Sequence, residues 1–390
     1  MEIVISCGIV LVAGILVGKL FEKIGIPGLV GMIFAGIIIG PYQWNVLDSV
    51  FLSYSAMIRQ AALIVILLRA GISLKYTDFK ETGKEVLMMS FLPALVEIIG
   101  ITLASVFLLG FNWIDGLLLG TVISAVSPAV IVPKMIKVID EGYGQDKKIP
   151  QLILAAASFD DILVLVLFSA CLSFHLNGSM DFISFLEIPV SIIMGIIAGG
   201  AFGWILSLFL HQIHRIVQVI ILGMLALLFY AVEGKIMFSA LIALVSLGMS
   251  IRHFDEESAS KLKVLLGYIW VVAEVFLFTL LGAAVNIPLM SVLGVFAVAV
   301  LTIGLLFRSS GVIISLSGKS WQWQEKLFCV FSYLPKATVQ AAIGSIPLAY
   351  NLAVGEDILA ISVLAILITA PLGALAVDKS YKKFLHKKEA

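Results

Sequence analysis

Charge is scarce in this sequence. Only 13% of its 390 residues are Asp, Glu, Lys or Arg, whereas 61% are hydrophobic and the mean hydropathy is +1.13. A water-soluble domain carries about twice that charged fraction, so the composition indicates a membrane protein. The 25 basic residues balance 25 acidic ones, which excludes the basic footprint of a nucleic-acid-binding protein.

Cysteine and long polar segments are also rare. The three cysteines, Cys7, Cys171 and Cys329, lie inside or at the edge of apolar runs, which excludes a disulfide framework and a thiolate metal site. No stretch between the apolar runs is long enough for a soluble catalytic domain. We therefore expect neither an enzyme nor a cofactor.

Apolar runs fill the chain instead. A membrane core about 30 Å thick needs about 20 apolar residues per helix, and cutting at charged or turn-rich breaks gives thirteen candidates. Their predicted starts lie near residues 3, 27, 57, 86, 116, 150, 184, 215, 236, 264, 291, 325 and 356. The first run follows no basic segment and precedes no cleavage site, so we expect it to be retained. The prediction is an all-α polytopic membrane protein.

The connections between these runs alternate in charge. The first, third and later odd connections carry Lys or Arg, and the even ones carry almost none, with Arg59 and Lys235 as exceptions. Basic loops favour the cytoplasm, so we expect a plasma or inner membrane protein with its amino terminus outside and its carboxyl terminus inside. The tail, 377–390, is basic and could bind anionic lipid headgroups or serve only as a topology signal.

Two spans carry proline in mid-membrane, at Ser127-Pro128 and at Leu334-Pro335. Proline removes a backbone donor and restricts the preceding residue, so we predict an interrupted helix at each site. Paired interruptions are typical of transporters built from inverted repeats, with the binding site at the breaks. We expect residues 1–26 to stand alone as one span, and 27–214 and 215–376 to form two inverted six-helix repeats.

Two adjacent carboxylates, Asp160 and Asp161, lie in the middle of the apolar run AAASFDDILVLVLF. Neighbours on a helix point about 100° apart, so one can pair with protein while the other faces a water-filled cavity. A carboxylate in such a cavity can hold either a proton or a small cation. Hard cations such as Na⁺ and Li⁺ favour oxygen ligands, and the neighbourhood offers hydroxyls and carbonyls freed by the breaks. The hydroxyl candidates are Ser127, Ser158 and Thr338.

Other charges in the spans need partners. Arg308 keeps its proton, so it requires a fixed anion. Pro335 follows Pro128 by 207 residues, and the position 207 residues before Arg308 is residue 101, one helical turn from Glu97. Glu97 is therefore a candidate partner of Arg308, and Asp160 is the competing one. Lys336 follows the second break and could offset the partial negative charge where a half-helix ends.

The motifs SFDDILVLVLF, SAVSPAVIVPKM, YLPKATVQAAIGSIPL and ILITAPLG resemble the monovalent cation/proton antiporter superfamily, nearest to sodium/hydrogen exchangers of the NHA type. The resemblance covers nearly the whole chain. It implies two crossing interrupted helices in a mobile core domain, a dimerisation domain, a homodimer, and an elevator-like movement. It also implies that Asp161 is the essential cation and proton carboxylate, with Asp160 as its partner.

Two departures from the family pattern matter. Arg308 stands where many bacterial members have a lysine that is thought to supply a second exchanged proton, so we expect one H⁺ per cation and electroneutral exchange. Ser127 replaces an aspartate that some relatives have before the proline.

Alternatives to Na⁺ or Li⁺ exchange are a K⁺/H⁺ antiporter, a sodium-coupled organic-anion symporter and a passive channel. An intramembrane aspartyl protease would need its two aspartates on different helices.

Overall fold

The computed structural model describes residues 2–73, 84–177, 182–232, 238–317 and 321–387. Within these ranges the chain is almost entirely helical. Ten helices are long and apolar enough to cross a membrane, and three shorter apolar segments, Gly28–Ile39, Ala240–Phe254 and Thr338–Ala349, bring the described total to the thirteen predicted. The prediction of an all-α polytopic fold is confirmed.

Contacts divide the chain into two units. Unit 1 comprises Met1–Arg59, Gly83–Val164 and Val275–Ala390, and unit 2 comprises Gln60–Thr82 and Leu165–Glu274. Three helices, α4 (Ser55–Ser73), α9 (Ile149–Asn177) and α13 (Glu256–Ala283), contribute residues to both units.

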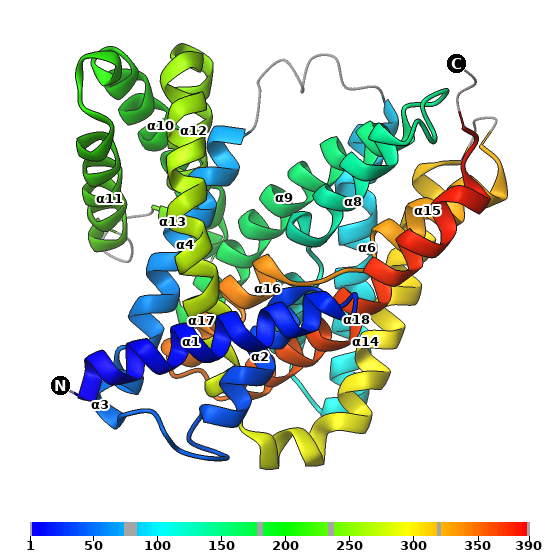
Figure 1. Cartoon of the computed structure of the whole chain (residues 1–390), viewed down its shortest axis with the longest axis horizontal. Coiled ribbons are helices and arrows are strands. Elements are labelled where there is room, and N and C mark those ends of the chain that lie inside the picture. Colours follow the sequence, from blue (N-terminus) through cyan, green and yellow to red (C-terminus); the bar gives the residue numbers. More distant parts are fainter. Residues whose placement is uncertain (1, 74–83, 178–181, 233–237, 318–320, 388–390) are drawn as a thin grey trace. The chain divides into compact units, whose positions relative to one another are not determined.

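Unit 1 contains every predicted site residue, and it includes the first part of α9. Its other helices are α1 (Glu2–Lys23), α2 (Gly28–Ile39), α3 (Ser49–Ser53), α6 (Lys84–Leu109), α7 (Trp113–Ile123), α8 (Pro128–Asp140), α14 (Ile287–Ser315), α15 (Trp323–Ser332), α16 (Thr338–Ile343), α17 (Ile346–Ala349) and α18 (Gly355–Phe384). In Figure 1, α15 lies along the carboxyl-terminal part of α18. An apolar cluster, including Met135, Ile153, Phe328 and Val377, joins these broken and long helices.

Helices α6 and α14 pack against each other more extensively than any other described helix pair of unit 1. Glycines permit this approach, because a Cβ at Gly311 would lie 2.7 Å from the Cα of Pro93, and one at Gly100 would lie 2.5 Å from the Phe307 ring. The middle of α6 therefore faces the carboxyl-terminal half of α14 inside the unit.

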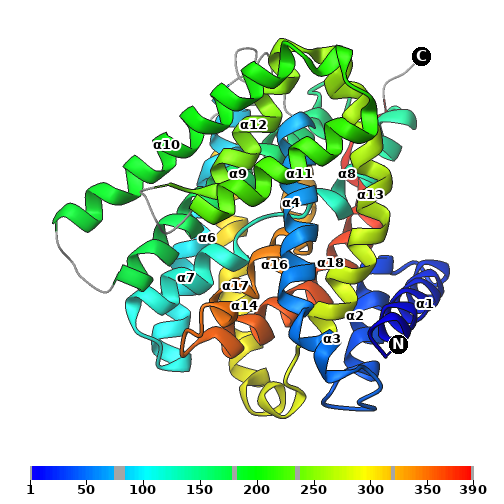
Figure 2. The ribbon, with the colours of Figure 1, turned by 90° about the vertical axis from the view of Figure 1, so that its left-hand side faces the viewer.

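Unit 2 is built around α10 (Phe182–Ser207) and α12 (Ala240–Phe254), which pack along each other, with α11 (Arg215–Val232) beside α12 (Figure 2). Gly199 lets α10 approach closely, since a Cβ there would lie 2.9 Å from the Leu247 nitrogen. A short 3-10 turn, Leu210–Gln212, leads from α10 to α11. Gln218 of α11 is buried and donates to the carbonyls of Leu210 and Ile213.

The carboxyl-terminal segment, predicted to be a basic tail, begins as helix. Residues 377–384 form the last part of α18. Asp378 forms an ion pair with Lys134 of α8, and Glu141 accepts hydrogen bonds from Tyr381 and pairs with Lys382. Their side chains hold the end of α18 against the broken helix, which the lysine count alone did not reveal. Residues 388–390 lie outside the described part.

Candidate functional site

Both predicted interruptions are present, and they meet. Helix α7 ends at Ile123 and α8 begins at Pro128, while α15 ends at Ser332 and α16 begins at Thr338. The Ser127 amide donates to the Pro335 carbonyl at 2.8 Å. Unwound backbone inside a membrane protein needs internal partners, and here each break supplies one to the other.

Gln340, in the first turns of α16, adds a second link between the breaks. Its side-chain nitrogen donates to the carbonyls of Ile123 at 2.9 Å and Ala125 at 2.8 Å. The Ser124 carbonyl accepts from Arg308. Freed carbonyls at the breaks stay a prediction as cation ligands, and these three each accept a hydrogen bond from a buried side chain. Gln340 was not predicted, and its only sequence signal is an amide in an otherwise apolar stretch.

Asp160 lies in α9 and is fully buried. One carboxylate oxygen, Oδ2, accepts from the Val126 amide at 2.7 Å and from Arg308 Nη2 at 3.0 Å. Asp160 therefore fastens α9 to the first break and to α14 together.

Arg308 contacts both of its predicted partners. Its Nη1 lies 2.6 Å from Glu97 Oε2, while its Nη2 reaches Asp160, and the side chains of all three are at most 1% exposed. The packing of α6 against α14 brings Glu97 and Arg308 together. The Tyr333 ring lies under the guanidinium, 5.1 Å from the ring centroid to the Cζ atom, which adds a cation–π contact. The two carboxylates that the sequence offered as alternative partners of Arg308, Glu97 and Asp160, are therefore both bound, because the planar guanidinium can pair with two carboxylates at once.

Lys336 has a different partner from the one predicted. Its ammonium lies 2.7 Å from Glu97 Oε2 and is buried, so it pairs with a carboxylate and not with the carbonyls at the end of α15. The four side chains form one buried chain, Lys336–Glu97–Arg308–Asp160. Two positive and two negative groups balance within it, as burial of charge in a medium of low polarity demands.

Of the two adjacent aspartates, Asp161 is the one that does not belong to this buried chain of four charged side chains. It follows Asp160 on α9, is partly exposed, and its Oδ1 has no hydrogen-bond partner among the described residues. The buried Ser127 hydroxyl and the Asp160 Oδ1 are likewise without a partner in the described part. These oxygens suit a hard monovalent cation, which takes oxygen ligands.

The remaining predicted ligands are less well defined. Thr338 is buried at the first position of α16. Ser158 lies one helical turn before Asp161, and its side chain falls outside the described part of the structure. No group of three or more His, Cys, Asp or Glu side chains that could hold a metal ion occurs among the described residues.

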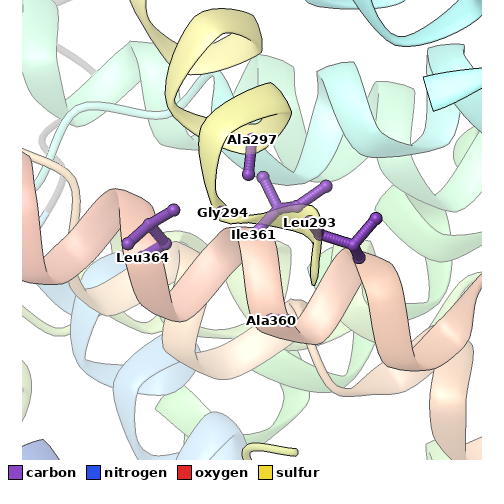
Figure 3. Close-up of a pocket in the computed structure, with 6 residues that line it drawn as sticks. All are labelled: Leu293, Gly294, Ala297, Ala360, Ile361 and Leu364. Atoms are coloured by element: carbon purple, nitrogen blue, oxygen red, sulfur yellow. The ribbon is translucent and has the colours of Figure 1, made fainter. Parts of the chain in front are cut away.

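A separate crevice between α14 and α18 offers no ligands. It has a volume of about 10 Å³ and is lined by apolar residues only, Leu293, Gly294, Ala297, Ala360, Ile361 and Leu364 (Figure 3). Without polar atoms it cannot replace the hydration shell of an ion. The oxygen cluster at the breaks is therefore the stronger candidate for a cation site.

Residues 8–378 match the model of the family described as sodium/hydrogen exchanger, transmembrane. The chain belongs to this family. Sodium/hydrogen exchanger 9B2 of Mus musculus is 33% identical over 398 residues, covering 95% of this chain and 72% of the relative. Sodium/hydrogen exchanger 9B1 of Homo sapiens is 31% identical over 396 residues, covering 94% and 75%.

The fold agrees with this assignment. The sodium proton antiporter MjNhaP1 from Methanocaldococcus jannaschii, solved at pH 8, has a TM-score of 0.81 with this structure, although only 22% of residues are identical. The match covers 98% of this chain and 99% of that one. This exchanger is therefore a multi-pass membrane transporter with the antiporter fold, which confirms the family and the fold predicted from the motifs.

Proposed function

We propose that this exchanger carries one Na⁺ or Li⁺ in exchange for one H⁺, and that both bind at Asp161. The observation that supports it is the charge balance of the buried chain Lys336–Glu97–Arg308–Asp160. Because its members neutralise one another, Asp161 is left with a negative charge that either a cation or a proton can neutralise. The two ions then compete for one group, and competition at one group is sufficient for coupled exchange.

The other oxygens have supporting roles in this proposal. Asp160 Oδ1 and the Ser127 hydroxyl complete the cation's shell, with Thr338 and Ser158 as further candidates. Arg308, Glu97 and Lys336 hold the charges in place and keep the site's net charge constant. Family membership favours this exchanger over the sodium-coupled organic-anion symporter, and K⁺ stays as an alternative cargo.

Alternating exposure of Asp161 would follow from an elevator-like movement of the helices that carry it, in a homodimer associated through residues 1–26. Helix α1 supports the proposed homodimer, because several of its apolar side chains are exposed and could contact a neighbouring copy or lipid. These side chains are Val4, Val12, Leu16 and Leu20. We place the exchanger in the plasma or inner membrane, with the amino terminus outside.

Proton flux in proteoliposomes tests the exchange. With a pH dye trapped inside, addition of Na⁺ or Li⁺ outside should drive proton movement in the wild type, and Asp161→Asn should abolish it because an amide cannot carry a proton. Asp48→Asn is the matched control: Asp48 caps α3, and asparagine caps a helix equally well. Flux that survives in Asp161→Asn would show that another group binds the ions.

Membrane voltage tests the stoichiometry. If one monovalent cation is exchanged for one proton, no net charge crosses, and an imposed voltage of either sign should leave the rate unchanged at fixed ion and pH gradients. A voltage-dependent rate would contradict electroneutral exchange and would make Lys336, the titratable cation of the buried chain, the next residue to examine.

A further inference from the structure

The amide of Gln340 spans the two breaks at the point where they cross. The side chain is fully buried on α16, and its nitrogen donates to two carbonyls of the opposite break, those of Ile123 and Ala125. A side-chain amide has a nitrogen that donates hydrogen bonds and an oxygen that only accepts them. Because both neighbours are carbonyl oxygens, the nitrogen must face them, which fixes the orientation of the amide.

The first break thus holds three consecutive carbonyls that already have donors. Those of Ile123 and Ala125 accept from Gln340, and that of Ser124, between them, accepts from Arg308. In the same segment the Val126 amide donates to Asp160. Gln340 and Arg308 therefore supply each of these three carbonyls with one hydrogen bond.

We infer that Gln340 is a positioning residue that sets cation selectivity, by withholding the Ile123 and Ala125 carbonyls from the transported ion. This inference rests on the proposed exchange at Asp161. With those carbonyls occupied, the side-chain oxygens left without a partner near the break, among the described residues, include those of Asp160, Asp161, the Ser127 hydroxyl and the Gln340 amide itself. Two of these four belong to carboxylates, and such a compact, negative set favours Na⁺ and Li⁺. Neutral carbonyl oxygens in number are what replaces the hydration shell of the larger K⁺ in proteins.

The test is the ratio of half-saturating K⁺ to half-saturating Li⁺ for proton flux in proteoliposomes. Gln340→Met keeps the length and volume of the side chain but donates no hydrogen bond. It should lower the ratio by about tenfold, because two carbonyls regain the capacity to bind an ion. If Gln340→Met does not purify as folded protein, Gln340→Leu carries the test. It also donates neither bond and adds no charge, so it should lower the ratio in the same direction.

Gln218→Met is the matched control. Gln218 is also a buried glutamine that donates to two carbonyls, but it belongs to unit 2. This variant should leave the ratio unchanged even if it lowers thermal stability. A folded Gln340 variant whose affinities for Li⁺, Na⁺ and K⁺ all weaken equally would overturn the inference and leave Gln340 a purely structural role.

Failure of the proposed function looks different. It would appear in the wild type, as proton flux that no cation drives or as flux that Asp161→Asn does not abolish, before any Gln340 variant is compared.

Discussion

Glu97 carries one negative charge and has two cationic partners. Its Oε2 accepts from both Arg308 and Lys336, and the three side chains are at most 1% exposed. Removing one member of a buried ion pair leaves the other charge desolvated without compensation, which costs about 3–5 kcal/mol. The stability of the site should therefore depend on charge balance more than on any single contact.

Glu97→Gln should lower the free energy of unfolding by about 3–5 kcal/mol, measured by equilibrium unfolding in mixed micelles. The double variant Glu97→Gln/Lys336→Gln removes one charge of each sign and leaves Arg308 paired with Asp160, so it should regain much of that loss. A double variant no more stable than Glu97→Gln would show that charge balance is not what Glu97 supplies.

Sequence alone identified most of the charged residues of the site but not their pairing. Glu97, Arg308, Asp160 and Asp161 stand out because an ionisable residue in an apolar run needs a partner or a function. That Lys336 would reach Glu97 could not be predicted, because the contact depends on the three-dimensional path of the unwound segment between α15 and α16. The role of Gln340 could not be predicted either. An uncharged amide costs less to bury than a charged group, so its presence in an apolar segment does not indicate a function.

At the scale of helices, the prolines predicted the breaks well. Pro128 is the first residue of α8, as its fixed backbone angle and missing donor favour, whereas Pro335 lies inside the unwound segment. Helix ends were harder to predict. Helix α13 begins at Glu256 and α18 continues to Phe384, in charged stretches that we expected to be connections. Charged residues at helix ends form helix as readily as loop, so hydropathy locates only the apolar part.

The repeat boundaries stay a prediction, and the broken helices favour different boundaries. The broken helices are the fifth and twelfth spans, so equivalent spans of the two repeats lie seven apart in the sequence of spans. The packed helices α6 and α14 are the fourth and eleventh spans and have the same separation. If the repeats were 27–214 and 215–376, equivalent spans would lie six apart, and the two broken spans would not be equivalent. We therefore propose that α1 to α9 and α11 to α18 form the two repeats, with α10 connecting them.

The contact between α8 and α18 has a predictable response to pH. Hydrogen bonds from Tyr381 and Lys382 lower the pKa of Glu141, which follows the last residue of α8. A lowered folded-state pKa stabilises the fold above the unfolded value of about 4.3, and that contribution is lost as pH falls through the folded value. Glu141 therefore stays ionised throughout the neutral range.

Glu141→Gln should accordingly leave the midpoint of the transport rate against pH unchanged between about pH 6 and 8. The measurement is the initial rate of Na⁺-driven proton flux at a series of internal pH values. Tyr381→Phe, which removes one of the two hydrogen bonds, is the companion variant and should behave alike. A shifted midpoint in either variant would assign pH sensing to this contact.

At the scale of the whole molecule, the alternation of basic loops predicts the direction in which every span runs. The even connection 40–48 should lie outside and the odd connection 141–148 inside. In a variant lacking Cys7, Cys171 and Cys329, a membrane-impermeant thiol reagent added to intact cells should label Gln43→Cys. Asp146→Cys should react only after the membrane is opened, since the reagent cannot reach the cytoplasm. Labelling of Asp146→Cys in intact cells, with Gln43→Cys protected, would invert the topology and with it the sense in which a proton gradient drives the exchanger.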